Sequence, residues 1–179
     1  MGFNLDDMIG KYKDFARGYL FYVKVTSPVG IQRDHPYLVS TASLPAQSLE
    51  TTSTNWQGNE YKFATVNTFD TFEITFKADV VHELRTNFLT WMKQIHDPVS
   101  NIHGNPADYF GQVDMTQLNS SGVGIMDYSL INAFPSAVGE ISLDYGTREI
   151  STFTVTFTYQ YHIVNSIYAG VPATEATIS

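Results

Sequence analysis

The chain contains no cysteine, little positive charge and no long apolar run. Without cysteine, a disulfide framework and a thiolate zinc site are both excluded. No stretch approaches the ~20 apolar residues that cross a bilayer as a helix, so we expect no membrane-spanning helix. Residues 1–7 hold two acids and no basic start, so the sequence predicts no secretion signal.

Lysine and arginine number 10 against 18 acidic residues, which gives a formal net charge of −8. Proteins that grip nucleic-acid backbone do so with these two cations. A protein that grips DNA is therefore not expected, although a wall past which DNA slides stays open. Charged residues make up 16% of the chain and aromatic residues 14%. The charged share is low against about 25% in typical soluble domains. This composition is typical of a subunit in an assembly, and it also fits an ordinary β-rich domain with a large core.

The clearest pattern lies near the C-terminus. From Phe153 to Ile163, bulky apolar residues alternate with Thr, Gln and His, which is the period of a strand with one buried face. The sequence predicts one long strand over residues 150–163. Eleven residues at about 3.3 Å each span roughly 36 Å, where a common strand has about five or six residues. In a lone small domain such a strand would leave a long edge open to pairing, so we expect neighbouring copies to cover it.

Shorter stretches repeat the alternation, and one stretch has helical spacing. Strands are predicted over residues 19–26, 37–43, 71–77, 110–117, 124–133 and 137–143. Residues 44–68 form a polar excursion, which we expect to be an extended hairpin with its turn at Gln57-Gly58-Asn59. Apolar residues at helical spacing predict a helix over residues 80–96, with Asp79 as its N-cap and Asp97-Pro98 as its end.

These elements predict a mainly β fold with one flanking helix. Two packed antiparallel sheets or a flattened β-barrel both fit the pattern. A single domain is predicted over residues 1–164, with an N-terminal arm over 1–17, the extended excursion over 44–68 and the helix over 80–96. Residues 165–179 are predicted to be a polar C-terminal tail.

Patterns that support catalysis or cofactor binding are few. His82-Glu83 begins like a zinc-protease helix, but position 86 is Thr where the second histidine is required. Glu140 and Asp144 would share a face of the strand predicted there, whereas a glycosidase pair needs carboxylates across a cleft. The aromatic residues of the last strand alternate with Thr and not with Lys or Arg, which favours core packing over a platform for single-stranded nucleic acid. We therefore expect no enzyme, no cofactor and no metal site.

A series of local patterns follows one order along the chain. The patterns are Asp14-Phe15-Ala16-Arg17 before Tyr19-Leu20-Phe21, Ser43-Leu44-Pro45-Ala46, Trp56-Gln57-Gly58 with Tyr61-Lys62, residues 68–76, Asp79 with Leu84-Arg85, Phe88 and Trp91, and Phe134-Pro135 with Ile141 and the Thr-rich strand ending at Tyr159. Together they resemble the tail tube proteins of contractile-tailed bacteriophages, which are related in fold to type VI secretion tube proteins. Gly18 stands where proline is common in that family, and residues from Asn165 onward match no part of it.

The resemblance implies hexameric rings that stack into the inner tube of a contractile phage tail. The tube would be the conduit for DNA and internal proteins. The implied partners are copies of the chain itself, the tail sheath, the baseplate hub or tube initiator, the tail terminator and the tape-measure protein. DNA would pass in transit without specific binding, and no membrane partner is implied. The implied location is the tail of the virion, after synthesis in the host cytoplasm.

Two sets of residues are candidates for roles in that assembly. The resemblance implies that the excursion and the N-terminal arm reach neighbouring subunits. The alternative for the excursion is that Trp56 folds back onto the core of its own subunit. A wall of hydroxyls and acids offers DNA phosphates few cations, so it would conduct DNA with little adhesion. Which sheet faces the channel is left open. The candidate inter-subunit contacts are Asp14, Phe15, Ala16, Arg17, Trp56, Gln57 and Gly58, and the candidates for the channel wall are Thr71, Glu73, Thr75, Thr154, Thr156 and Thr158.

Three other functions stay open at this point. A tube initiator at the baseplate and an injection-system tube that carries effectors share the implied fold. The third, from another class, is a small-molecule-binding β-barrel whose inward Phe and Tyr residues line a pocket. That alternative predicts a monomer with a dry internal cavity.

Overall fold

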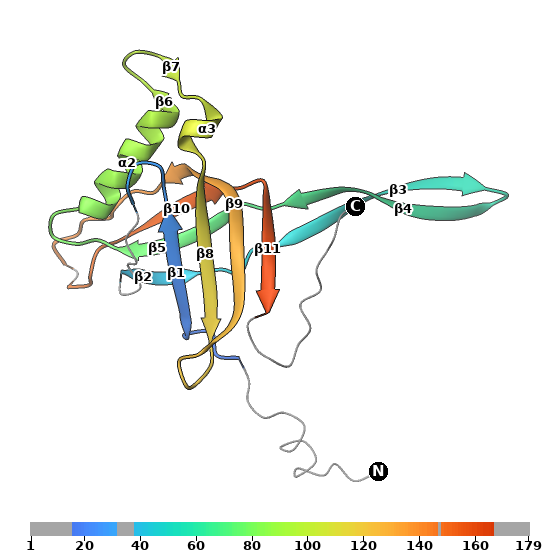
Figure 1. Ribbon diagram of the computed structural model, residues 1–179, viewed down its shortest axis with the longest axis horizontal. Coiled ribbons are helices and arrows are strands. Elements are labelled where there is room, and N and C mark those ends of the chain that lie inside the picture. The colour runs from blue at the N-terminus through green and yellow to red at the C-terminus, as the bar shows by residue number, and fades with distance from the viewer. Residues whose placement is uncertain (1–15, 32–37, 147, 167–179) are drawn as a thin grey trace, which may run out of the picture.

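A computed structural model describes residues 16–31, 38–146 and 148–166 (Figure 1). The predicted mainly β fold with a flanking helix is confirmed. No helix in these ranges is long and apolar enough to cross a membrane. The elements, in chain order, are β1 (Phe21–Thr26), β2 (Val39–Ala42), β3 (Gln47–Trp56), β4 (Asn59–Phe69), β5 (Phe72–Lys77), α2 (Glu83–Ile95), β6 (His96–Asp97), β7 (Ile102–His103), α3 (Pro106–Tyr109), β8 (Gly111–Leu118), β9 (Gly124–Val138), β10 (Thr152–Thr158) and β11 (Tyr161–Ser166).

Strand β9 belongs to two antiparallel layers. Its first part, residues 124–133, pairs with β8 on one side and β11 on the other, and β1 lies beyond β8. Its second part, residues 134–138, pairs with β10, which is followed by β5 and β2. We call these layers the β1 sheet and the β5 sheet. Within the described ranges no ladder joins β1 to β2, so the two layers do not close into a barrel.

The division between the layers begins at Asn132. Gly111 of β8 pairs with Ala133, but the next residue of β8 pairs with Ile131, which leaves Asn132 as an extra residue in β9. Its φ of 54° lies in the left-handed region, which asparagine tolerates better than most residues. An extra residue of this kind is a β-bulge, and bulges bend a strand and increase its twist. β9 can therefore leave one layer and enter the other without ending.

The prediction of separate strands over 124–133 and 137–143 is wrong, because β9 continues through Pro135. Proline cannot donate to a ladder and is confined to edges and bulges. Pro135 lies at such a place, since the register between β9 and β10 shifts beside its pairing with Phe157. Residues 139–146 and 148–151 form no strand. Glu140 and Asp144 therefore do not share a strand face.

The prediction of a single strand over 150–163 is also wrong. β10 ends at Thr158 and β11 begins at Tyr161, so the chain turns beside the bulge in β9. The Asn132 side-chain nitrogen donates to Gln160 Oε1 at 2.8 Å, and the Gln160 backbone N–H donates to the Ile131 carbonyl at 3.2 Å. β10 lies between β5 and β9, so its edges are covered within the chain and not by a neighbouring copy.

The predicted buried face of this region is right up to the turn and wrong after it. Phe153 and Phe157 are buried, as is Tyr159. Beyond Gln160 the alternation is lost: Tyr161, Ile163 and Val164 are 43%, 43% and 44% exposed, and His162, expected on the wet face, is half-buried. The buried face of β10 does not continue, because β11 lies in the other layer and pairs with the first part of β9.

Helix α2 covers the core between the two layers, as its single apolar stripe predicts (Figure 1). The Phe88 ring lies 5.4 Å from the Phe76 ring and 5.9 Å from the Phe157 ring. The helix begins at Glu83 and not at residue 80, because His82 has a left-handed φ of 53°. Asp79 is therefore not the N-cap, although its Oδ2 accepts the Glu83 backbone N–H at 3.5 Å.

Strand β8 approaches the helix so closely that only glycine fits at its first residue. A Cβ on Gly111 would lie 2.5 Å from the Thr26 carbonyl oxygen and 2.8 Å from the Trp91 ring. Trp91 cannot easily move away, since it is fully buried and its Nε1 donates to the Tyr109 carbonyl at 2.8 Å.

We expect Gly111→Ala to lower the free energy of unfolding of the isolated subunit by about 1–3 kcal/mol, the cost of overpacking. Chemical denaturation followed by tryptophan fluorescence measures it. Gly18→Ala is the matched control, because its Cβ would meet nothing within 4 Å, and it should change stability by less than about 0.5 kcal/mol. Equal effects of the two substitutions would contradict the close approach at Gly111.

Candidate assembly surfaces

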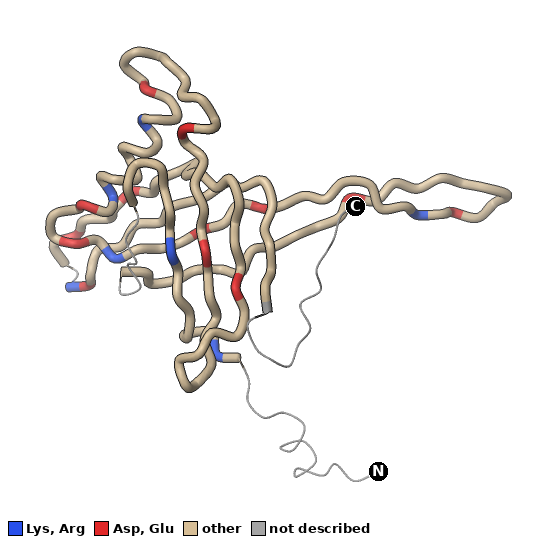
Figure 2. The backbone as a smooth tube through the Cα atoms, viewed as in Figure 1, with Lys and Arg blue, Asp and Glu red and all other residues tan. Residues whose placement is uncertain are grey.

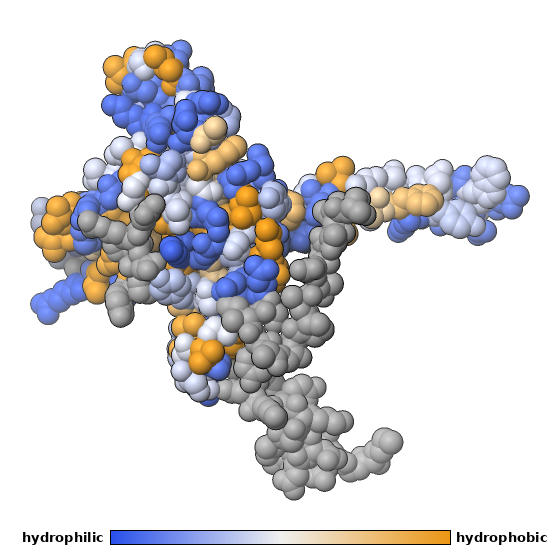
Figure 3. All heavy atoms as spheres, viewed as in Figure 1, coloured by the Kyte–Doolittle hydropathy of each residue, from blue (hydrophilic) through white to orange (hydrophobic). Residues whose placement is uncertain are grey.

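The excursion is a two-stranded hairpin that leaves the body of the protein. β3 and β4 pair with each other, and Gln57 and Gly58 form the turn with φ values of 50° and 82°. Two positive φ values are the mark of the primed turns that suit hairpins. The prediction of an extended hairpin with its turn at this position is confirmed. Every residue from 47 to 67 is exposed, and the space-filling view shows the hairpin projecting away from the body (Figure 3). We call it the arm.

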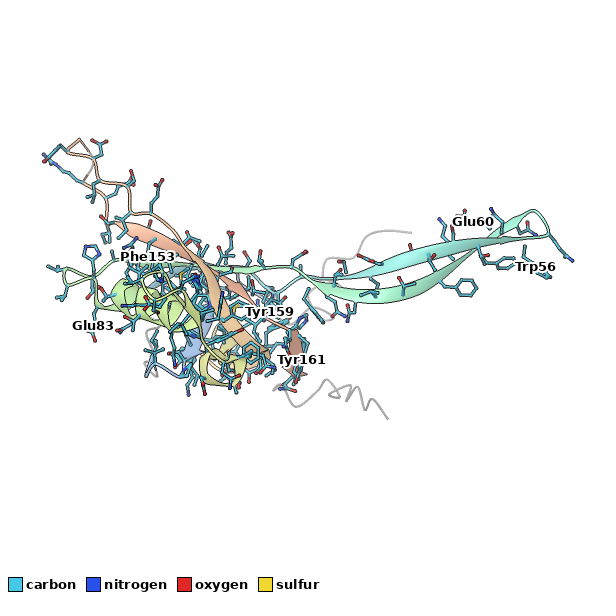
Figure 4. The ribbon with its side chains drawn as sticks, turned by 90° about the horizontal axis from the view of Figure 1, so that it is seen from above. Trp56, Glu60, Glu83, Phe153, Tyr159 and Tyr161 are labelled. Atoms are coloured by element: carbon cyan, nitrogen blue, oxygen red, sulfur yellow. The ribbon has the colours of Figure 1, made fainter. Side chains whose placement is uncertain are left out.

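The outer half of the arm has one aromatic face and one polar face. Thr54 pairs with Tyr61, Thr52 with Phe63, and Trp56 with Asn59, so the three aromatic residues lie on the same side. Figure 4 shows Trp56 and Glu60 on opposite sides of the ribbon. The exposed fractions of Trp56, Tyr61 and Phe63 are 67%, 48% and 56%. Trp56 is therefore not folded back on its own core.

The inner end of the arm is held against the turn between β10 and β11. The ring of Phe69, the last residue of β4, lies 5.9 Å from the Tyr159 ring and 5.3 Å from the His162 ring. The Tyr159 hydroxyl also donates to the Ala46 carbonyl at 3.4 Å. These contacts hold Phe69 of β4, and Ala46 just before β3, against the turn at residues 159–160.

The outward face of the β5 sheet carries most of the threonines that the sequence proposed for a channel wall. Thr154 pairs with Thr75, and their hydroxyl oxygens lie 3.1 Å apart. Thr156 pairs with Glu73. Thr71 is exposed just before β5, and Thr158 is half-buried opposite Phe134 of β9. We call this surface the threonine face; which side of an assembly it meets stays a prediction.

A second polar face, which the sequence reasoning missed, covers the outward side of the β1 sheet. Gln112 Nε2 and Ser129 Oγ each donate to Asp114 Oδ1 at 2.7 Å. The Thr116 hydroxyl donates to Asp127. We call this surface the acid–hydroxyl face, and Figure 2 shows its acids on β8 and β9. The alternation of Gln112, Asp114 and Thr116 with apolar residues was a signal for it, but only the strand register shows that acids from two strands share one side.

Both outer strands of the β1 sheet have one unpaired edge. Among the described residues, β1 pairs with β8 and β11 pairs with β9, and neither has a second partner. The edge of the β5 sheet at β9 is different, because Pro135 lies there and has no N–H to donate. Exposed strand edges are templates for pairing with another chain. The two edges of the β1 sheet are therefore the better sites for joining copies.

The N-terminal candidates are only partly within the described ranges. Asp14 and Phe15 lie outside them. Ala16 and Arg17 are exposed, and Arg17 Nη1 donates to the Tyr19 hydroxyl at 3.0 Å. Their contact with a neighbouring subunit stays a prediction.

The described part of the chain offers no constellation for metal binding, since no three His, Asp or Glu residues gather there. His96 and His103 do stack, with ring centroids 4.4 Å apart, across the short β6–β7 pair. The hollow inside the core, lined by Val25, Phe76, Phe88 and their neighbours, measures only about 10 Å³. A ligand does not fit there, because that volume is about one water molecule. This packing weighs against the small-molecule-binding barrel.

Comparison with known proteins relates the chain to one group. Residues 20–165 match the family described as phage tail tube protein. A tail tube protein of Serratia phage KSP90 is 27% identical over 129 residues, which cover 71% of this chain and 73% of that protein. A chain in the baseplate of the anti-feeding prophage has a TM-score of 0.69 at 15% identity, covering 86% of this chain and 97% of its own. A chain in the sheath–tube complex of the extracellular contractile injection system PVC has a TM-score of 0.62 at 18% identity, covering 93% and 100%. At these identities the two structures show a shared fold.

The environment of His162 predicts a pH dependence of stability. Burial lowers the pKa of this side chain from its ordinary value of 6.5, and its Nδ1 is buried without a hydrogen-bond partner among the described residues. A lowered pKa means that the unfolded state takes up the proton first, so the free energy of unfolding falls as the pH drops below about 7. We expect urea denaturation to show that the wild type loses stability relative to His162→Phe between about pH 7 and pH 5.5. Parallel pH curves would contradict the burial of the ring.

Proposed function

Because this chain belongs to the phage tail tube protein family, we propose that its copies stack as hexameric rings into the inner tube of a contractile tail, the conduit for DNA. The family is structural and not enzymatic, and its place is the tail of the virion. The observation that carries the proposal is the arm. An isolated two-stranded hairpin is marginally stable in water, yet every residue of this one from 47 to 67 is exposed in the single chain. Another chain must therefore cover it.

Ring closure is proposed to use the two free edges of the β1 sheet. β11 of one copy would pair with β1 of the next, so that each copy supplies one edge and receives the other. A heterologous contact of this kind closes into a ring when the rotation between copies allows it. Closure also removes every unpaired edge of the sheet, and with it the risk of uncontrolled pairing.

The channel wall is proposed to be the acid–hydroxyl face. The sheet that joins copies edge to edge must also form the continuous inner surface, and this sheet has both edges free. Asp114 and Asp127 would repel DNA phosphates, while Lys24 on β1 is the cation on the same side, opposite Asp114. Low adhesion follows, because DNA binding depends on cations that replace its counterions. The threonine face, with Thr71, Glu73, Thr75, Thr154, Thr156 and Thr158, is the second candidate for the wall.

The tube is proposed to act with the tail sheath, the baseplate hub or tube initiator, the tail terminator and the tape-measure protein. The solved structures of similar fold come from a baseplate, a sheath–tube complex, a cap and a terminator, which supports tail components as partners. A tube subunit polymerises without a baseplate, whereas an initiator adds only to a preformed hub. Sheath and capsid genes beside this gene would indicate a phage and not an injection system for effectors.

We expect the purified wild-type protein to form hollow rods at high concentration by electron microscopy. Replacing residues 53–62 with Asn-Gly shortens the arm while keeping the Thr52–Phe63 pair. This variant should keep the circular dichroism of the wild type and form no long rods, because the outer half of the arm is lost. A control with Ser53→Ala and Asn55→Ala keeps the length and the aromatic face of the arm, and it should still form rods.

Rods of normal length from the shortened variant would show that the arm is not an assembly surface. A wild-type protein that stays a compact monomer at every concentration would overturn the tube itself.

Single cysteines identify the wall, because the natural chain has none. Lys24 and Glu73 are exposed and lie on the acid–hydroxyl face and the threonine face, respectively. In rods, Lys24→Cys should react with a small maleimide but not with a polymer-linked maleimide too wide for the channel. Glu73→Cys should not show this difference. In isolated subunits both should react with both reagents, and mass spectrometry measures the products.

The reverse pattern, with size exclusion at Glu73→Cys only, would assign the wall to the threonine face. Equal reaction of Lys24→Cys with both reagents in rods would place the acid–hydroxyl face on the outside of the tube.

A further inference from the structure

The aromatic face of the arm is an apolar surface without a cover. Trp56, Tyr61 and Phe63 lie on one side of the hairpin, and the residues that pair with Tyr61 and Phe63 on that side are threonines. An aromatic side chain buries about 150–250 Å² when it packs fully, and these three are a little over half exposed, so this face offers roughly 300 Å². A standard protein interface buries about 800 Å² per partner. The face is therefore large enough to form the centre of a contact between copies.

The body of the same chain has a groove of matching character. A hollow of about 550 Å³ opens between α2 and the second part of β9. Its lining is mostly apolar, and the apolar residues that line it are Leu89, Met92, Ile95, Pro98, Phe134 and Pro135. The arm of the same copy does not fill the groove, because residues 47–67 are all exposed. A second hollow, between β1 and β2, is lined by Gly18, Ser40 and Thr41 among others and is less apolar.

Charge does not oppose a contact between the two surfaces. Two copies of a chain with a net charge of −8 repel each other, so contacts between them favour neutral or oppositely charged partners. The aromatic face carries no charge. Glu60 pairs with Asn55 and lies on the opposite, polar face of the arm. Lys93 lines the groove and is 63% exposed, with only a loose pair to Asp97 at 3.9 Å.

We propose that the aromatic face of the arm docks into the groove between α2 and β9 of a second copy. This inference rests on the proposed tube, and it names the surface that receives the arm. Trp56 at the tip would enter the hollow between Met92 and Phe134, and Tyr61 and Phe63 would cover its rim. The contact removes both exposed apolar surfaces from water at once.

Cross-linking between single-cysteine copies tests the docking. Asn59→Cys lies on the aromatic face at the tip, and Ser136→Cys lies at the groove. After mixing, assembly and mild oxidation, a disulfide-linked dimer should form between these two variants and not within either one alone, because a disulfide requires Cα atoms within about 7 Å. Val123→Cys on the β8–β9 loop, 56% exposed, is the matched control for the receiving copy. It should not cross-link.

Substitutions on the two faces of the arm in the same mixture test the orientation. Adding Trp56→Ala to the arm copy should lower the initial rate of cross-linking at least about fivefold, the effect of truncating a buried aromatic anchor. Adding Glu60→Gln, on the opposite face of the arm, should leave the rate unchanged. Rods that form without a cross-link at residue 136, or with an equal one at residue 123, would overturn the docking while leaving the tube intact. A wild type that forms no rods overturns the tube instead.

Discussion

The turn that β9 and the C-terminal strands make together is the constraint on which the rest of this structure depends. Asn132 is an extra residue in β9, and its side chain bonds to Gln160, where β10 gives way to β11. β9 and the C-terminal segment from β10 to β11 therefore pass from one layer to the other at the same place. Without this paired turn there would be one flat sheet, and flat sheets with long edges are prone to uncontrolled pairing. With it, the protein has two layers around one core.

The same turn supports the inner end of the arm. Tyr159 and His162 stand on either side of Gln160, and both contact Phe69 at the end of β4. An arm held by these contacts leaves the body in a defined direction and keeps its outer half clear of its own core. A surface that is meant for another copy must be both rigid and exposed. In this protein the contacts at Phe69 hold the inner end of the arm in place, and the length of β3 and β4 keeps the outer half of the arm exposed.

Two further features of assembly follow from the division into layers. Each layer has its own outward polar face, and only the β1 sheet has two edges that nothing blocks. Pro135, which lies between the two strands predicted over 124–133 and 137–143, leaves one edge of the other sheet without an N–H donor. Edge chemistry, more than the polarity of either face, therefore separates the two candidates for the channel wall.

Local patterns in the sequence were sufficient for the elements whose neighbours are close in the chain. The arm and its turn at Gln57-Gly58 follow from hairpin chemistry, and the buried faces of β5 and β10 follow from a period of two. The apolar stripe of α2 follows from helical spacing, although its start does not, since the left-handed His82 carries no sequence signal of its own.

Only the tertiary structure decided where the long C-terminal pattern breaks and which residues share a surface. The break at Gln160 depends on a bulge 28 residues earlier in the chain, and no local period contains that information. For the same reason, the register between β8 and β9 was needed to show that Asp114 and Asp127 lie on one face. A sequence determines the period of each strand, whereas the pairing between distant strands determines what their side chains form together.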